Sequence, residues 1–187
     1  MKNKVFIIAE LSANHNGDIN IALESVRAAK RTGADAVKIQ TYTPDTLTIN
    51  CKNNYFKINH GTAWDGEYLY DLYKRAYSPW EWHKEIFKVA NEEGIICFSS
   101  PFDTTAVDLL EELNVPVYKI ASFEIQDIPL ISYAASKQKP IILSTGIAEI
   151  QDIELAVETC KKVGNDDITI LKCTSAYPAD PKDANLL

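Results

Sequence analysis

The alternation of short apolar runs with segments of helical spacing constrains the fold of this chain more than any other feature. The runs are nearly continuously apolar, which is typical of parallel strands that are covered on both faces. A helical segment follows most of them, so that strand and helix repeat along the 187 residues. The predicted strands lie at residues 5–9, 36–40, 95–99, 117–121, 140–144 and 168–172.

The spacing of apolar residues also predicts where the helices lie, and capping residues mark several of their ends. Asp18 is placed to begin the first helix and Gly33 to end it, while Asp103 is more suited to be an N-cap than a catalytic acid. The predicted helices lie at residues 18–32, 80–93, 104–113, 129–136 and 149–163.

One long interruption, at residues 41–79, breaks the repeat and is rich in Tyr, Asp and Asn. Its length is sufficient for a functional segment. Aromatic residues are dense between Trp64 and Trp82. We interpret most of them as core and helix-packing residues, and a sugar-facing wall or lid is the alternative.

The βα alternation allows two architectures, a doubly wound sheet or a (β/α)₈ barrel. The first strand is not followed by a G-x-G-x-x-G turn, which disfavours the dinucleotide-binding sheet. Both architectures stay open from the residues alone. A complete (β/α)₈ barrel typically needs about 250 residues, so six strands and a long insertion in 187 residues would make only part of one.

Composition narrows the function classes. The chain has 19 basic and 26 acidic residues, for a net charge of −7, which disfavours nucleic-acid binding. No apolar run approaches the roughly 20 residues of a membrane-spanning helix, and the first residues are interpreted as a strand and not as a signal peptide. Its 4 cysteines are widely spaced without a C-x-x-C motif. We predict a reduced, cytoplasmic protein in which the thiols fill the core.

Polar residues follow the predicted strands, and in a barrel these strand ends converge on one catalytic face. Lys38, Lys119 and Lys172 each stand at such an end in an otherwise acidic chain. Lysine charges with hydroxyl donors suit a phosphate or carboxylate, so we expect a shared anion site. The turn at residues 144–146 offers further backbone N–H groups. The hydroxyl donors are Ser99, Ser100, Ser122, Ser144, Thr145, Thr174 and Ser175.

Glu10 is the first carboxylate at a strand end. A buried glutamate is unfavourable without a partner. It should therefore face a cation, a metal or a substrate hydroxyl, and an ion pair with Lys38 or Lys119 is the alternative. His15 is interpreted as a hydrogen-bonding loop residue, because no second histidine lies nearby in the sequence. A complete metal site is not visible and its ligands are unknown.

The strand-end motifs occur in an order that resembles the sialic acid synthase family over nearly the whole chain. They are IAE at 8–10, NHNG at 14–17, GADAVKIQ at 33–40, FSSPFD at 98–103, YKIAS at 118–122, STG at 144–146 and CTSAYP at 173–178. Other segments resemble the pseudaminic acid branch of that family. They are ELSANHN at 10–16, TYTPDT at 41–46, LYDLY at 69–73, YSPWEWH at 77–83 and LKCTS at 171–175.

The resemblance implies a transferase that condenses phosphoenolpyruvate with a 2,4-diacetamido-2,4,6-trideoxy hexose of the altrose type. The products are a nonulosonic acid and phosphate, which leaves by C–O cleavage. The resemblance also implies a divalent metal (Mn²⁺, Mg²⁺ or Co²⁺) that activates the aldehyde, and a homodimeric full-length protein. It further implies an α/β TIM barrel, of which residues 1–187 are the N-terminal portion with about six βα units. Two further strands and a small antifreeze-like (SAF) domain complete the family's chain, and their absence here predicts an inactive fragment.

Site roles follow from the same resemblance. The phosphoenolpyruvate residues are expected to be Lys38, Ser100, Lys119, Ser122 and Ser144, while Glu10, Gln40 and Glu124 match positions near the metal or the sugar. Lys172 stands where many family members have a metal-binding histidine. Catalytic roles are expected for Glu10, Lys38, Lys119 and Lys172. The substrate-binding set is Gln40, Ser100, Ser122, Glu124, Ser144, Thr145, Ser175 and Tyr177.

Three alternatives remain open from the sequence. The first is an N-acetylneuraminate or legionaminate synthase of the same family. The second is an aldolase barrel in which Lys119 or Lys172 forms a Schiff base, which needs a lysine desolvated enough to lose its proton. The third is a non-catalytic fragment whose open sheet edges require association with another chain.

Overall fold

The computed structural model describes residues 5–59, 61–62, 64–176 and 179–185, and in these ranges the predicted alternation of strand and helix is confirmed. The chain divides into two units, Met1–Ala106 and Val107–Leu187, which we describe in turn. The division falls within helix α5 (Thr104–Glu112). None of the described helices combines the length and apolar character needed to cross a membrane.

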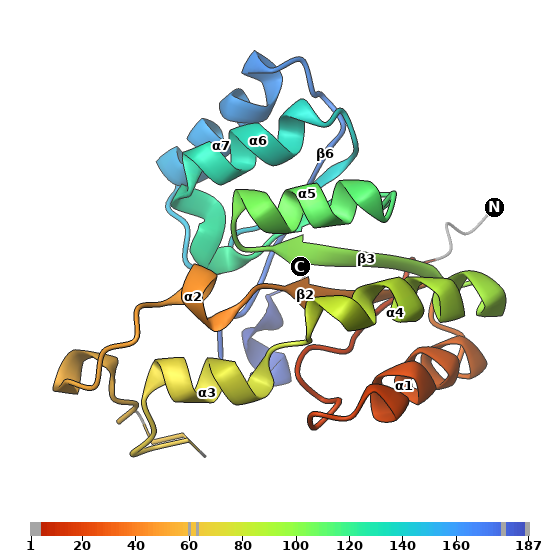
Figure 1. Ribbon diagram of the computed structural model, residues 1–187. Coiled ribbons are helices and arrows are strands. Elements are labelled where there is room, and N and C mark those ends of the chain that lie inside the picture. Colours follow the sequence, from red (N-terminus) through yellow and green to blue (C-terminus); the bar gives the residue numbers. More distant parts are fainter. Residues whose placement is uncertain (1–4, 60, 63, 177–178, 186–187) are drawn as a thin grey trace. The chain divides into compact units, whose positions relative to one another are not determined.

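In the first unit, strand β2 pairs in parallel with β1 on one side and with β3 on the other. Helices α1 and α4 lie side by side against this sheet (Figure 1). Apolar residues from strands and helices form one core cluster, which includes Val26, Ile39, Ile86 and Cys97. The elements are β1 (Ile8–Glu10), α1 (Ile19–Arg31), β2 (Ala36–Thr41), α4 (Trp80–Glu93) and β3 (Ile96–Pro101).

Helix α1 shows why these segments form where the sequence places them. Asp18 is its N-cap, and the carboxylate accepts a hydrogen bond from the backbone N–H of Asn20. Ala22, Val26 and Ala29 recur at helical spacing and are buried. The Asp103 carboxylate likewise accepts from the first N–H groups of α5, as expected of an N-cap.

In the second unit, β5 pairs in parallel with β4 and with β6. Helices α6 and α7 lie side by side (Figure 1). The large side chains of Tyr118, Ile131 and Leu143 are fully buried. The elements are β4 (Tyr118–Ile120), η2 (Ser122–Gln126), α6 (Ile128–Ser136), β5 (Ile141–Ser144), α7 (Ile150–Lys162), β6 (Ile168–Leu171) and η3 (Pro181–Ala184).

The first strand is shorter than predicted. We expected it at residues 5–9, whereas β1 is Ile8–Glu10 and the side chains of Val5, Phe6 and Ile7 are exposed. Ile7 instead forms two hydrogen bonds with Asp35. The Ile7 N–H donates to the Asp35 carboxylate at 2.9 Å, and the Asp35 N–H donates to the Ile7 carbonyl at 2.9 Å. The prediction, which rested on apolar character alone, therefore placed the beginning of this strand too early.

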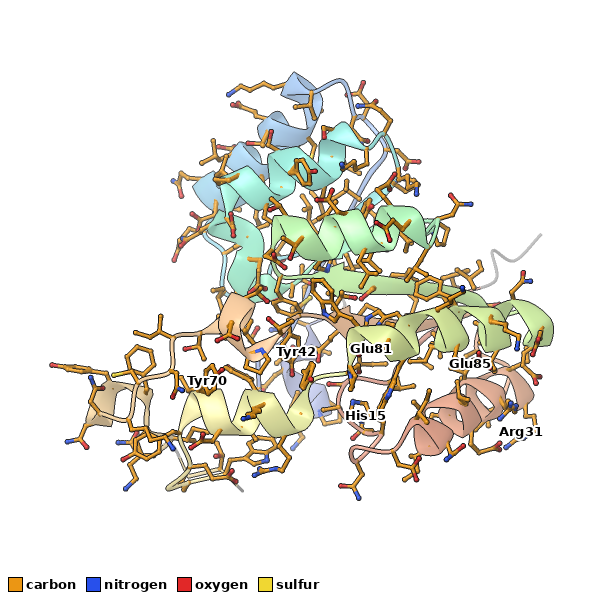
Figure 2. All side chains as sticks on the ribbon, viewed as in Figure 1. His15, Arg31, Tyr42, Tyr70, Glu81 and Glu85 are labelled. Carbon is orange, nitrogen blue, oxygen red and sulfur yellow. The ribbon has the colours of Figure 1, made fainter. Side chains whose placement is uncertain are left out.

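The interruption at residues 41–79 contains helical elements that were not predicted. They are α2 (Pro44–Leu47), η1 (Asn54–Phe56) and α3 (Leu69–Ala76). Apolar residues of α3 recur at helical spacing, but none of its residues is fully buried. Polar contacts add to its packing. The hydroxyl of Tyr70, labelled in Figure 2, donates to Asp45 at 3.0 Å, and Lys52 forms an ion pair with Asp71.

The aromatic residues of this region mostly pack, as predicted. Tyr42 makes edge-to-face contacts with Tyr73 and Phe102, and its carbonyl accepts from the Trp80 indole at 3.1 Å. Burial raises the pKa of Tyr42 to about 12. Trp64 departs from the interpretation, because it is 46% exposed.

The cysteines confirm the core-filler interpretation only in part. All 4 are free, but only Cys97 and Cys160 are buried, whereas Cys51 and Cys173 are partly exposed. Burial raises the pKa of the Cys97 thiol to about 12, which keeps it protonated and unreactive.

A buried polar network joins the ends of β2 and β3 to α4. The Thr41 hydroxyl lies 2.9 Å from His83 Nε2 and 2.6 Å from the Ser99 hydroxyl, and the Ser99 hydroxyl donates to the Ile39 carbonyl. All three side chains are fully buried. Burial lowers the pKa of His83, because the imidazolium form is poorly solvated there.

The network predicts that acid weakens this fold before its carboxylates titrate. Below the ordinary histidine pKa of 6.5 the unfolded chain binds a proton at His83 while the folded chain does not. The free energy of unfolding therefore falls with falling pH, by up to about 1.4 kcal/mol per pH unit. Urea unfolding at pH 7.5, 6.5 and 5.5 measures this dependence. His83→Gln should reduce the slope, and an equal slope in the variant would contradict the assignment.

Candidate functional site

In the first unit, the ends of β1, β2 and β3 bring together a charged cluster. The Lys38 ammonium lies 2.6 Å from a Glu10 carboxylate oxygen and donates to the Ser100 hydroxyl at 3.3 Å. The Lys38 side chain is 14% exposed and the Glu10 side chain 42%. Glu10 is thus not buried, and of the two expectations for it the structure shows the ion pair with Lys38.

Ser12, which the sequence did not single out, connects this cluster to its neighbour Gln40. Its backbone N–H donates to Glu10 at 3.1 Å, and its hydroxyl donates to the Gln40 side-chain oxygen at 3.3 Å. Its φ of 49° is in the left-handed region. No signal in the sequence identifies such a contact, because Ser12 and Gln40 meet only through the pairing of β1 with β2.

His15 fixes the loop that contains Ser12. It is fully buried, and its Nδ1 accepts from the Gly17 N–H at 3.1 Å. The Nε2 of His15, which is labelled in Figure 2, lies 3.1 Å from the Ser78 hydroxyl, and the ring makes an edge-to-face contact with Trp82. Burial lowers the pKa of His15, so the ring is neutral. The interpretation of His15 as a hydrogen-bonding loop residue is therefore confirmed.

In the second unit, a buried lysine stands at the ends of β4 and β5. The Lys119 ammonium contacts the Ser144 hydroxyl and donates to the Ile120 carbonyl at 3.1 Å. The residue is only 8% exposed. The Cys173 thiol donates to the same Ser144 hydroxyl at 3.3 Å. A cation and hydroxyls in such a setting form an anion-binding arrangement.

Gly146 packs closely among the serines of this cluster. Its N–H donates to the Ser122 hydroxyl at 3.3 Å. A Cβ at this position would overlap the Ser175 hydroxyl and lie 3.0 Å from the Ser122 hydroxyl and 3.2 Å from the Cys173 Cβ. Only glycine leaves room for this arrangement.

Thr145 does not have the role expected of it. Both its N–H and its hydroxyl donate to the Leu171 carbonyl, at 3.2 and 2.9 Å. The Gly146 N–H is engaged by Ser122. The expectation that this turn presents free N–H groups to an anion is therefore wrong for Thr145 and Gly146, because neighbouring groups already accept from them.

Glu124 follows the same strand end and has a buried oxygen. Its Oε2 is buried, and among the described residues it has no hydrogen-bond partner. Burial raises the pKa of Glu124, as does the nearby Asp127 carboxylate, while Lys119 opposes them. Such a carboxyl group is suited to receive a polar group of a ligand.

The remaining predicted residues are placed differently. Lys172 is exposed, and its ammonium donates to the Thr174 hydroxyl at 3.0 Å and to the Asp183 carbonyl at 2.8 Å. Tyr177 lies outside the described residues. The shared anion site of Lys38, Lys119 and Lys172 involves both units and stays a prediction.

The described residues do not fit a complete site for the expected divalent metal. Within residues 5–59, 61–62, 64–176 and 179–185, no three side chains of His, Cys, Asp or Glu gather as a metal site requires. The unpartnered Glu124 oxygen is one suitable ligand atom. We therefore derive no reaction step through a metal.

The packing around Gly146 gives a direct test of the second-unit cluster. Gly146→Ala should displace the three side chains around it and destabilise the chain by about 1–3 kcal/mol, as overpacking does. It should also weaken the binding of inorganic phosphate, used as a simple anion to probe this cluster, measured by calorimetry. Gly164→Ala is the control, because Gly164 has a φ of 81° but no atom within 4 Å of the added Cβ. Equal binding by both variants would argue against an anion site here.

Comparisons with known proteins place the chain in a family. Residues 25–187 match the model of the NeuB family. Pseudaminic acid synthase from Helicobacter pylori is 56% identical over 181 residues, which are 97% of this chain and 53% of that protein. N,N'-diacetyllegionaminic acid synthase from Legionella pneumophila is 40% identical over 97% of this chain and 52% of its own length. The chain thus spans about half the length of these curated relatives.

The fold is shared as well. The crystal structure of N-acetylneuraminic acid (sialic acid) synthetase from Leptospira borgpetersenii, in complex with citrate, superposes with a TM-score of 0.84 at 33% identity. The superposition covers 98% of this chain and 59% of that one. The expected α/β fold of the TIM-barrel class is confirmed, and so is the family that the motifs indicated. With its strand-end lysines and serines, and with most of its length matched, the chain belongs to the NeuB family.

Proposed function

We propose that this chain provides the phosphoenolpyruvate-binding part of a pseudaminic acid synthase. The observation on which the proposal rests is the buried Lys119 ammonium against the Ser144 hydroxyl, next to the closely packed Gly146. Its similarity to pseudaminic acid synthase, at 56% identity against 40% for the legionaminic acid enzyme, favours the altrose-type hexose as co-substrate.

The proposed reaction forms one carbon–carbon bond and releases phosphate. C3 of phosphoenolpyruvate attacks the aldehyde carbon of the open-chain hexose, a water molecule adds at C2, and the C2–O bond to phosphate breaks. Phosphoenolpyruvate, the hexose and water thus become a nonulosonic acid and inorganic phosphate. The water oxygen remains on C2 of the sugar acid.

The residues of the two units have distinct parts in this proposal. Lys119, with the hydroxyls of Ser144 and Ser122, neutralises and orients the anionic phosphoenolpyruvate. Lys38 and Ser100 provide a second cation and hydroxyl, while Glu10, Gln40 and Glu124 face the sugar. The unpartnered oxygen of Glu124 supports such a part, because a hydroxyl of the hexose would supply its missing hydrogen bond.

The proposal extends to the setting of the reaction. A divalent cation would polarise the aldehyde when bound, and the described residues supply at most part of its ligands. We propose that the protein acts in the cytoplasm as a homodimer.

The overall reaction can be tested with the complete gene product. Incubation with Mn²⁺, phosphoenolpyruvate and the altrose-type hexose should release phosphate only when the sugar is present. In H₂¹⁸O the label should enter the sugar acid and not the phosphate, because the C–O bond breaks. No sugar-dependent release would refute the proposal, and label in the phosphate would refute C–O cleavage. N-acetylmannosamine and the legionaminic acid precursor serve as competing substrates.

The role of Lys119 predicts a large kinetic effect. Lys119→Ala should lower kcat/KM for phosphoenolpyruvate at least ~10²-fold, since removing a charge-stabilising donor typically has that effect. Lys162→Ala is the matched control, because Lys162 is 70% exposed on α7 and pairs only weakly with Glu158, at 3.9 Å. If Lys119→Ala turns over near the rate of the control, Lys119 is not part of the phosphoenolpyruvate site.

A further inference from the structure

We infer that Ser12 is a positioning residue, whose hydroxyl holds the side-chain amide of Gln40 in place at the end of β2. The inference rests on the proposed function, in which Gln40 faces the hexose. It adds a residue that the strand-end motifs do not identify, and it assigns that residue an effect on the sugar and not on phosphoenolpyruvate.

The backbone of Ser12 is the first observation. Its φ of 49° is in the left-handed region, which a residue with a Cβ occupies at a cost of roughly 1–2 kcal/mol. Glycine would adopt this conformation freely. Residues held in such conformations concentrate at functional sites, and a side chain retained here has to be explained by its contacts.

The backbone and the side chain of Ser12 have different hydrogen-bond partners. The N–H donates to Glu10 Oε1, while the other oxygen of Glu10 pairs with the Lys38 ammonium. That contact survives any substitution except proline. The hydroxyl has a single hydrogen bond within the described residues, to Gln40 Oε1 at 3.3 Å. The side chain of Ser12 therefore acts on Gln40.

This hydrogen bond holds the Gln40 amide at one place on the strand. A serine hydroxyl can donate to the amide oxygen or accept from the amide nitrogen, so either orientation of the amide keeps the contact. The other end of the amide stays available to a ligand, because no other hydrogen bond from the described residues engages the Gln40 side chain. Gln40 is two residues from Lys38, and hence on the same face of β2, and is opposite Ser100 in the β2–β3 register.

The available end of the amide can meet an acetamido group or a hydroxyl of the hexose, each of which can donate or accept a hydrogen bond. Without the Ser12 hydroxyl, the Gln40 side chain samples other rotamers and meets that group in only a fraction of the molecules. Binding of the sugar weakens, whereas binding of phosphoenolpyruvate by Lys119 and the serines is unaffected.

Two substitutions separate this role from a purely structural one. Ser12→Gly removes the hydroxyl and relieves the backbone, so its melting temperature should equal or exceed that of the wild type. Its KM for the hexose should nevertheless rise about tenfold, the effect of one lost hydrogen bond, with KM for phosphoenolpyruvate unchanged. Ser12→Thr keeps the hydroxyl on a β-branched residue that tolerates positive φ poorly. It should melt lower and keep a normal KM for the hexose.

The assay uses the complete gene product with Mn²⁺, phosphoenolpyruvate and the altrose-type hexose, and follows phosphate release. If the variant with the lower melting temperature is also the variant with the higher KM for the hexose, Ser12 has only a structural role and the inference fails. A double-mutant cycle adds a second criterion, because Ser12→Gly should have no effect in a Gln40→Ala background. An inactive wild type would refute the proposed function, whereas an active wild type with the same KM as Ser12→Gly would refute the inference alone.

Discussion

The register of the parallel strands decides where each candidate functional group lies. Glu10 is opposite Lys38 between β1 and β2, and Gln40 is opposite Ser100 between β2 and β3. Because side chains alternate between the two faces of a strand, a slip of β2 by one residue would turn Lys38 and Gln40 toward α4. The ion pair of Lys38, its contact with Ser100 and the contact of Gln40 with Ser12 would then be lost together.

The side chains on the opposite face of β2 also require this strand register, although none of them is charged. Thr41 and Ser99 bond to each other and to His83 of α4, in surroundings from which water is excluded. Hydroxyls buried without partners would destabilise the unit, whereas partnered hydroxyls favour this register over its neighbours. One strand therefore has a polar network on the face toward the helices and an ion pair on the other face. Both are satisfied only when β1, β2, β3 and α4 are in place.

The parts of the fold that follow from the sequence are those in which local pattern and burial agree. Helix α1 has an N-cap and an apolar stripe, so its position was predictable. Helix α3 has the apolar spacing but no fully buried residue, and it was missed because the surrounding Tyr-, Asp- and Asn-rich composition indicated an interruption. The beginning of β1 was misplaced since Val5 and Phe6 are apolar but exposed.

In the candidate site, too, some features could be predicted and others could not. The positions of Lys38, Lys119 and the serines could be predicted, because the sequence indicates where each strand ends. The hydrogen-bond partners of these groups could not be predicted. Thr145 is engaged by a carbonyl of β6 and Lys172 by the carbonyl of Asp183, and neither partner has a side-chain signal. The part played by Ser12 depends on a backbone angle that the residue type disfavours.

Helix α3 also affects how the first unit moves. Its polar contacts with α2 and its neighbours are largely exposed, such as Tyr70 with Asp45 and Arg75 with Glu67. None of its residues is fully buried, whereas β2 and β3 are largely buried, so α3 should open at a lower free energy than the sheet unfolds. Its amides should then exchange their hydrogens with solvent at rates set by this local opening, and those of β2 and β3 only through unfolding of the unit. The amides of the long segment after β2 should thus exchange faster than those of the sheet beside it.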